Sequence, residues 1–320
     1  MSRRRRSKYN GLLAVRKAPG PTSHDVVDMA RRALGERRIG HTGTLDPMAE
    51  GVLLLCVGVA TRLQQFLLQW DKTYHGVIRL GTATDTYDSE GTQTEPSGPP
   101  PELDEGALRR LETRFTGDID QRPPPYSAKK VGGKKLYELA RNGETVDIEP
   151  KRVHVERLSI VPGPDQDTLL LEATTSSGFY VRTLAHDIGV ELGCGAHLAH
   201  LDLVSIGPYT SADALCQEKL QEAQSTEEVI VSPAWRSIDE IALPYPDVEI
   251  NPSAEQRFLH GQEVIVFRAG GDEMMAASRV TVHSQKGALL GVGSVQSVLA
   301  RGRTLSIRPT VVLIGSGVNS

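Results

Sequence analysis

The chain has 320 residues, of which 39% are hydrophobic and 24% are charged. These values are typical of a folded globular protein with one large domain and a smaller one. No apolar run approaches the roughly 20 residues that span a membrane, and three widely spaced cysteines argue against a disulfide framework or a structural zinc site. We therefore expect a protein of the reducing cytoplasm.

The net charge is −4, but the charges are unevenly distributed. Residues 1–40 hold eleven Arg or Lys and three acidic residues, whereas residues 85–120 hold ten acidic residues and three Arg. Binding of a nucleic acid depends on the local potential, so the acidic total does not exclude it. A basic arm over residues 1–10 is either a solvated tail or a phosphate-binding segment.

The first elements predicted after the arm are a short buried strand over residues 11–15 and a helix over residues 24–34. Pro19, Gly20 and Pro21 form a turn between them, and Thr22 or Ser23 is expected to cap the helix. The helix is predicted from an apolar stripe with helical spacing.

The segment Gly40–Gly58, GHTGTLDPMAEGVLLLCVG, then places one carboxylate, Asp46, in a turn that precedes an apolar run. Pro47 restricts Asp46 to extended or turn geometry, and Gly40, Gly43 and Gly51 permit unusual backbone angles. An Asp before Pro is commonly a simple turn former, so the residue alone does not establish chemistry.

Further along the chain, residues 73–80 alternate as a strand does, residues 95–104 read as a surface loop and residues 105–115 as a helix. Paired strands are expected over residues 153–162 and 168–175. Phe179–Gly193 is predicted as a strand that leads into a helix.

Composition changes near residues 226–246, and short β segments follow. They are expected at residues 248–250, 263–268, 275–282, 288–295 and 304–314. We predict an α+β chain with a body over residues 11–245 and a β-rich module over residues 246–320.

Common nucleotide sites are not predicted, because neither a phosphate loop nor a dinucleotide fingerprint is present in the sequence. His197 and His200 have a spacing that one helix face could present, with Cys194 nearby, so a metal site there is a weak alternative.

Eight motifs, in order, resemble those of the TruB family of tRNA pseudouridine synthases. They are residues 17–27 (KAPGPTSHDVV), 38–47 (RIGHTGTLDP), 71–74 (DKTY), 81–88 (GTATDTYD), 121–130 (QRPPPYSAKK), 133–138 (GKKLYE), 178–184 (GFYVRTL) and 192–198 (LGCGAHL). The last motif also gives His197 an explanation other than metal binding.

The resemblance implies a pseudouridine-synthase fold with a mixed, largely antiparallel central sheet and a small C-terminal PUA-like RNA-binding domain. It implies an isomerase that converts uridine to pseudouridine in the T loop of tRNA, at position 55, by flipping the base, without a cofactor or metal. By similarity Asp46 is the catalytic nucleophile. Arg182 pairs with it, which would lower its pKa, and Tyr74 is the active-site tyrosine that stacks on the base.

Other site residues also follow from the resemblance. His41 would enter the RNA loop, and Tyr180 and Leu201 would line the pocket. Phosphate contacts are expected from basic side chains, namely Lys17, Arg38, Lys129, Lys130, Lys134 and Lys135.

One departure concerns the two positions after Leu201, where the family commonly has arginines and this chain has Asp202 and Leu203. The change bears on RNA affinity and substrate range. We expect a monomer that binds the T stem-loop of tRNA, no membrane and no obligatory protein partner. A tRNA-folding chaperone with secondary catalysis, and a guide-RNA-dependent enzyme, are the alternatives.

Overall fold

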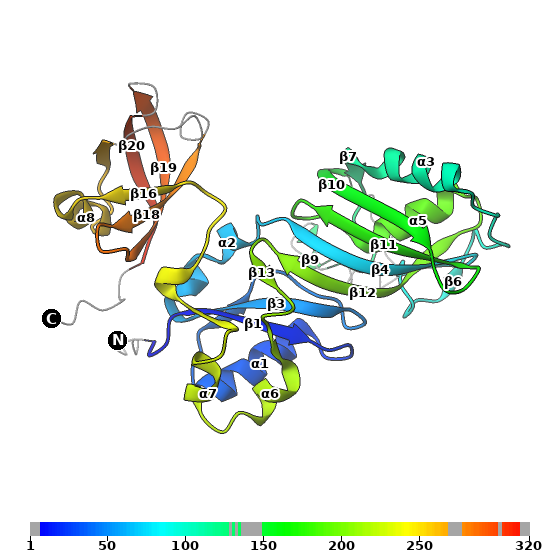
Figure 1. Ribbon diagram of the computed structural model, residues 1–320, viewed down its shortest axis with the longest axis horizontal. Coiled ribbons are helices and arrows are strands. Elements are labelled where there is room, and N and C mark those ends of the chain that lie inside the picture. The colour runs from blue at the N-terminus through cyan, green and yellow to red at the C-terminus, as the bar shows by residue number, and fades with distance from the viewer. Residues whose placement is uncertain are drawn as a thin grey trace.

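A computed structural model describes residues 7–127, 130–131, 134–135, 149–267, 277–299 and 303–313. Within these residues the chain forms two parts, a body built on one long sheet and a smaller β-rich domain that follows it in sequence (Figure 1). None of the described helices is long and apolar enough to cross a membrane.

The main path of the body's sheet runs in the order β14, β1, β3, β12, β4, β11, β10, β7. These strands are β14 (Leu215–Cys216), β1 (Gly11–Lys17), β3 (Glu50–Val57), β12 (Ala196–Ile206), β4 (Lys72–Leu80), β11 (Thr168–Thr175), β10 (Lys151–Pro162) and β7 (Gly117–Gln121). The β1–β14 and β3–β12 pairs are parallel and the other pairs on this path are antiparallel, so the expected mixed, largely antiparallel sheet is confirmed.

Shorter strands extend this sheet or lie beside it. Strands β2 (Ile39–His41), β13 (Tyr209–Thr210) and β15 (Trp235–Ser237) pair with β3, β12 and β1, while β5 (Ala83–Thr84) pairs with β6 (Gln93–Thr94) and β8 (Lys130–Val131) with β9 (Lys134–Lys135). The short helical segments η1 (Gly58–Arg62) and α2 (Gln64–Leu67) follow β3.

Helices cover the sheet at its two ends (Figure 1). Helices α1 (Ser23–Leu34), α6 (Gln217–Glu222) and α7 (Thr226–Ile230) lie by β1 and β3 and share an apolar core with them, whereas α3 (Glu105–Phe115) and α5 (Val181–Glu191) lie by the other half. Thr22 caps α1: its hydroxyl accepts from the Asp25 N–H and the Asp25 carboxylate accepts from the Thr22 N–H. The predicted helices at residues 24–34 and 105–115 are confirmed.

The strand expected before α5 is wrong. Residues 176–180 form a turn in which Gly178 has a φ of +87°. The Gln121 side chain satisfies both backbone groups of Tyr180, accepting from its N–H at 2.7 Å and donating to its carbonyl at 3.0 Å. A side chain therefore replaces the strand partner that an extended segment would need.

The smaller domain is a five-stranded sheet in the order β16, β18, β19, β20, β17, with α8 (Pro252–Leu259) beside it. Its strands are β16 (Asp247–Ile250), β17 (Val264–Phe267), β18 (Arg279–Ser284), β19 (Leu289–Leu299) and β20 (Thr304–Val312). Parts of the predicted segments 263–268, 275–282 and 304–314, namely residues 268, 275–276 and 314, lie outside the described residues. The β-rich, PUA-like character expected of this domain is confirmed.

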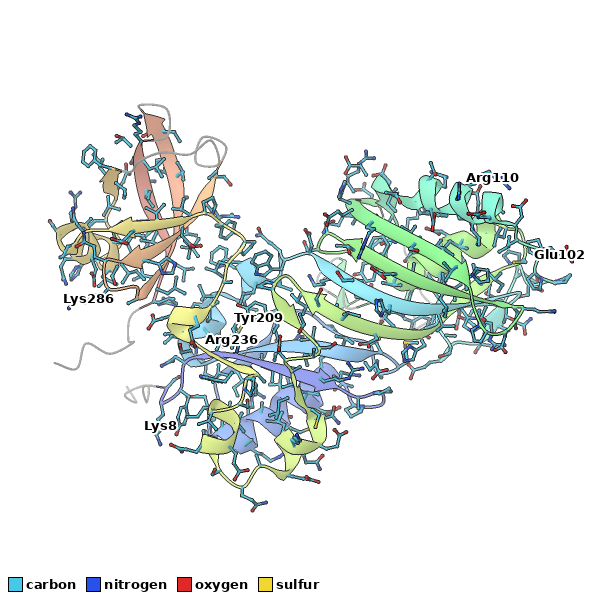
Figure 2. All side chains as sticks on the ribbon, viewed as in Figure 1. Lys8, Glu102, Arg110, Tyr209, Arg236 and Lys286 are labelled. Carbon is cyan, nitrogen blue, oxygen red and sulfur yellow. The ribbon has the colours of Figure 1, made fainter. Side chains whose placement is uncertain are left out.

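The two parts touch through the connecting segment 238–246 and through α2. Tyr209, labelled in Figure 2 near the junction, donates its hydroxyl to the Ala242 carbonyl and accepts from the Ala242 N–H. The short segment η2 (Ile238–Glu240) begins the connection, and the Asp239 carboxylate accepts from the Leu289 N–H of β19 at 2.8 Å. The smaller domain is thus packed against the body.

Candidate active site

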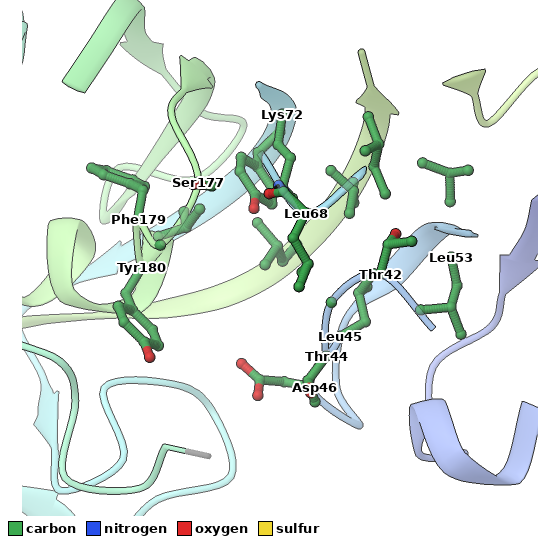
Figure 3. Close-up of a pocket in the computed structure, with 18 of the residues that line it drawn as sticks. Thr42, Thr44, Leu45, Asp46, Leu53, Leu68, Lys72, Ser177, Phe179 and Tyr180 are labelled. Carbon is green, nitrogen blue, oxygen red and sulfur yellow. Dashed lines mark hydrogen bonds between the residues drawn. The ribbon is translucent and has the colours of Figure 1, made fainter. Parts of the chain in front are cut away.

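A cavity of about 430 Å³ opens beside the centre of the long sheet, where the segment 42–46 faces the turn before α5 (Figure 3). Its walls come from β3, β4 and β12 and from these two segments, so residues far apart in sequence meet there. Its lining side chains include Asp46, Leu68, Lys72, Tyr74, Ser127, Phe179, Tyr180, Arg182, Leu201 and Leu203. This volume lies within the range of small-ligand sites.

Asp46 lies on a loop whose backbone is hydrogen-bonded to the side chains of Ser23 and Lys17. The Ser23 hydroxyl, at the start of α1, donates to the Leu45 carbonyl at 3.0 Å and accepts from the Leu45 N–H at 2.9 Å. The Lys17 ammonium donates to the carbonyls of Ala18, Pro47 and Ala49 at 3.0, 3.2 and 2.6 Å. The loop around Asp46 is therefore fixed on both sides of the carboxylate.

Arg182 forms an ion pair with Asp46. Its Nε lies 2.9 Å from Asp46 Oδ2 and its Nη2 lies 3.3 Å from Asp46 Oδ1, which makes a bidentate contact. Nη1 donates to Asp88 Oδ2 and to the Thr86 carbonyl, both at 3.0 Å, and Nη2 also donates to the Tyr126 carbonyl. The Arg182 and Asp88 side chains are 7% and 4% exposed, whereas Asp46 is 32% exposed. One carboxylate is thus buried behind the arginine and the other faces the cavity.

The pKa of Asp46 is raised above its ordinary value, because burial outweighs the attraction of Arg182; Asp88 adds to the rise and Lys17 opposes it. Arg182 acts in the expected direction, but burial has the larger effect on the pKa of Asp46. Arg182 is the main group that keeps the proton off Asp46.

Tyr74 lies on β4 in the middle of the sheet, between Ala173 of β11 and Leu203 of β12, and it lines the cavity. Burial, and then the charge of Asp46, raises the pKa of the Tyr74 phenol above its ordinary value. Its hydroxyl therefore holds its proton and can donate it in a hydrogen bond.

Tyr180 and Leu201 also line the cavity. In Figure 3 Tyr180 and Asp46 approach the cavity from opposite sides. Leu201 is buried on β12, and burial raises the pKa of Tyr180. With Asp46, Tyr74 and Arg182, these two complete the five predicted residues that the structure brings together around one cavity.

His41 does not line the cavity. It ends β2 half-buried, with Nδ1 2.7 Å from the Gly43 carbonyl, and its own carbonyl accepts from Gln64 Nε2 at 2.7 Å. Burial lowers the pKa of His41, which favours the neutral imidazole. It lies two residues before Gly43, at the edge of the cavity wall.

The predicted phosphate-binding residues differ in their placement. Lys17 is fully buried and its ammonium already has three carbonyl partners, so its predicted contact with phosphate is wrong. Arg38 is exposed, with its Nε 2.7 Å from the Thr61 hydroxyl. Lys129 and the side chains of Lys130, Lys134 and Lys135 lie outside the described residues.

Two charged residues of this site carried no prediction of their own. Asp88 belongs to the motif over residues 81–88, and Lys72 to the motif over residues 71–74, but neither was assigned a role. Lys72 lines the cavity and donates to the Leu68 and Trp70 carbonyls, and burial lowers its pKa to about 8. The presence of a charged residue within a family motif is the sequence signal that could have indicated a role for Asp88 and for Lys72.

Asp202, at the position where an arginine was expected, is paired. Its Oδ2 lies 3.1 Å from Arg16 Nη2, which also lies 3.1 Å from Glu50 Oε2, and Glu50 Oε1 lies 3.0 Å from His200 Nε2. Arg16 thus lies between two carboxylates, so its charge is taken up by these pairs and does not replace that of the arginine the family commonly has at residue 202.

The alternative of a metal bound by His197 and His200 loses its basis, because both residues lie on a strand and not on a helix. His197 Nδ1 is 2.8 Å from the Thr82 carbonyl, while His200 contacts Glu50. Over the residues that the structure describes, no group of three or more His, Cys, Asp or Glu could hold a metal ion.

Comparisons with known proteins agree with this architecture. Residues 31–181 match the model of the TruB family pseudouridylate synthase N-terminal domain, and residues 182–245 match that of the tRNA pseudouridylate synthase B C-terminal domain. The tRNA pseudouridine synthase B of Symbiobacterium thermophilum is 44% identical over 258 residues, which cover 80% of this chain and 83% of the relative. That of Burkholderia mallei is 40% identical, covering 92% and 96%.

The fold is also that of a chain in the crystal structure of a Cbf5-Nop10-Gar1 complex. The TM-score is 0.71 with 23% sequence identity, over 94% of this chain and 84% of the other.

Proposed function

The chain belongs to the TruB family of tRNA pseudouridine synthases, and from this premise we propose that it isomerises the T-loop uridine at position 55 of tRNA with Asp46 as the nucleophile. The observation that carries the proposal is the paired Asp46 and Arg182 at one cavity with Tyr74 and Leu201. A uridine that leaves its stack would find an aromatic face, an apolar wall and one carboxylate there.

The isomerisation breaks the bond between C1′ of the ribose and N1 of uracil and forms a bond between C1′ and C5. The proton that C5 loses is balanced by the proton that N1 gains, so nothing is oxidised and no group leaves the nucleotide. In the proposed mechanism an Asp46 oxygen donates an electron pair to a carbon of the uridine, forms a covalent adduct and departs once the base has turned.

The other cavity residues have supporting roles in this proposal. Arg182 holds both carboxylate oxygens of Asp46 and opposes their protonation, which keeps the nucleophile available. Tyr74 and Tyr180 pack on the flipped base, and the phenol of Tyr74 donates a hydrogen bond to it. His41 enters the RNA loop, and Arg38 contacts phosphate together with the lysines at 129, 130, 134 and 135.

The domains divide this work as follows. Residues 1–10 are proposed as a basic arm, residues 11–245 as the catalytic domain and residues 246–320 as the PUA-like RNA-binding domain. The proposed enzyme is a monomer that needs no protein partner and no cofactor. Sedimentation of the purified chain, alone and with tRNA, tests its oligomeric state.

The test compares the wild-type chain with Asp46→Asn on a T-stem-loop transcript that carries tritium at C5 of the target uridine. The substitution keeps the size of the side chain and removes its nucleophilic charge, so tritium release is expected to fall by more than about 10³-fold while RNA affinity is kept. A transcript with cytidine at that position should release no tritium. Full activity of Asp46→Asn would exclude this nucleophile, and pseudouridine at another position would exclude the T-loop assignment.

A further inference from the structure

Tyr87 has an unusual backbone conformation beside the active site. Its φ is +65°, and it is the one residue other than glycine with a positive φ in the part of the chain that the structure describes. Side chains with a Cβ resist this region, so a neighbouring contact must favour it here.

The residues on both sides of Tyr87 hold Arg182. The Thr86 carbonyl and the Asp88 carboxylate each accept from Arg182 Nη1 at 3.0 Å. The left-handed residue between them reverses the chain and presents both acceptors to the same guanidinium nitrogen. The conformation of Tyr87 therefore bears directly on the direction in which Arg182 points.

The Tyr87 ring is held by the same helix that carries Arg182. Residues 182 and 186 are four apart on α5 and share one face of it. The His186 ring stacks on the Tyr87 ring, with centroids 3.8 Å apart and planes 11° from parallel. His186 Nδ1 is buried without a hydrogen-bond partner, so the stack is the contact by which His186 engages this turn.

The turn also has hydrogen bonds within itself, where Asp88 Oδ1 accepts from the Thr86 hydroxyl and the Glu90 N–H, and further bonds to β12. The Tyr87 carbonyl accepts from the Leu198 N–H at 3.0 Å, and the Ser89 N–H donates to the Leu198 carbonyl at 3.1 Å. These bonds fix the turn to β12, while the ring stack and Arg182 fix it to α5. Loss of the stack would leave Arg182 alone to hold the turn against α5.

We propose that Tyr87 and His186 are positioning residues, whose stacked rings hold Thr86 and Asp88 against Arg182 and so direct the guanidinium to Asp46. The inference rests on the proposed role of Asp46 as nucleophile. It adds two residues that lie outside the cavity and act only through Arg182.

The experiment measures the single-turnover rate of tritium release and the RNA affinity of the full-length chain. We expect Tyr87→Ala and His186→Ala each to lower the rate about tenfold, because small displacements of a catalytic group are costly, and to leave the affinity unchanged. Tyr87→Phe keeps the ring and is the matched control, with the wild-type rate expected. His186→Leu fills the same space without a stack and should behave as His186→Ala does.

Two further variants separate this role from a merely structural one. Tyr87→Gly relieves the backbone strain but lacks the ring, so its thermal midpoint should not fall below that of Tyr87→Ala while its rate stays low. The double variant Tyr87→Ala/His186→Ala should be no slower than either single one, since both remove one contact. A wild-type rate for Tyr87→Gly or His186→Leu, or additive losses, would overturn the proposal.

Failure of this inference is distinguishable from failure of the proposed function. An inactive Asp46→Asn with fully active Tyr87 and His186 variants would reject the positioning role alone. An active Asp46→Asn would reject the nucleophile, whatever the other variants do.

Discussion

Lys17 carries a charge into the interior of the body. Its side chain is fully buried, and its ammonium holds the part of the loop that follows Asp46 through the Pro47 and Ala49 carbonyls. Burial lowers the pKa of Lys17 to about 8, and the charge of Asp46 opposes this shift. The unfolded chain keeps the ordinary value near 10.5, so between these two pH values the unfolded chain binds more protons than the folded one.

The free energy of unfolding should therefore rise with pH in this window, because the folded chain no longer has to bury a charge once Lys17 loses its proton. Lys17→Met removes this contribution, and the slope of stability against pH between 8 and 10 should fall by at most about 1.4 kcal/mol per pH unit. Urea unfolding at several pH values measures the slope. Arg38→Gln, at an exposed position, should leave it unchanged; an equal slope in Lys17→Met would contradict the assignment.

The sequence made Asp46 predictable because the residues around it are conformationally restrictive and because the motif is long. Lys17 was misjudged for a physical reason: a lysine in a basic N-terminal stretch has the composition of a phosphate-binding residue, and only the fold shows that three carbonyls surround it. Asp88 was overlooked similarly, since its partner Arg182 is 94 residues away.

At the level of secondary structure, two adjacent residues at the start of α1 have different roles. Thr22 caps the helix, and Ser23 bonds both backbone groups of Leu45, next to Asp46. Ser23→Ala leaves two buried backbone groups without partners, which should lower the free energy of unfolding by about 1–3 kcal/mol and also slow tritium release. Thr22→Ala should cost about 1 kcal/mol through the lost cap and leave the rate unchanged.

Chemical denaturation and single-turnover kinetics on the same two variants make this comparison. Equal rates for Ser23→Ala and the wild-type chain would show that the Leu45 contact is not needed for catalysis.

The elements that local pattern predicted are those with a clear period and clear ends, such as α1 and α3. Strand β12 was not predicted, and its histidines were read with helical spacing. Its neighbours explain this: β12 lies between β3 and β4 in the interior of the sheet, and its pairing with β4 is irregular at two places, so a period of two is obscured. The turn before α5 depends on Gln121, a partner 59 residues away that no local pattern contains.

On the scale of the whole molecule, the smaller domain shares a core with the body. Leu289 and Val292 of β19, with Leu313, belong to the same buried cluster as the body's central strands, whereas Leu290 belongs to the domain's own core. Arg62, at the end of η1, also donates to the Val312 carbonyl of β20. We therefore expect the wild-type chain to unfold in a single thermal transition.

Leu289→Ala removes a buried side chain from the joint, and Leu290→Ala removes one from the domain's own core. Both should be destabilised by about 2–5 kcal/mol. Only Leu289→Ala is expected to split the calorimetric transition in two, because it weakens the contact between the parts. Two transitions in the wild-type chain, or a single one in Leu289→Ala, would show that the domains are coupled differently.

The segment that bears Asp46 is held by hydrogen bonds from Ser23 and Lys17 and by the ion pair with Arg182, and these contacts exist in the free protein. A loop that is already fixed in this way has little to gain from rearranging around its ligand, so part of the discrimination among RNAs should come from the energy needed to deform each RNA. Loops whose uridine unstacks easily should then be the faster substrates, and the selectivity of the enzyme becomes a property of RNA mechanics as much as of protein contacts.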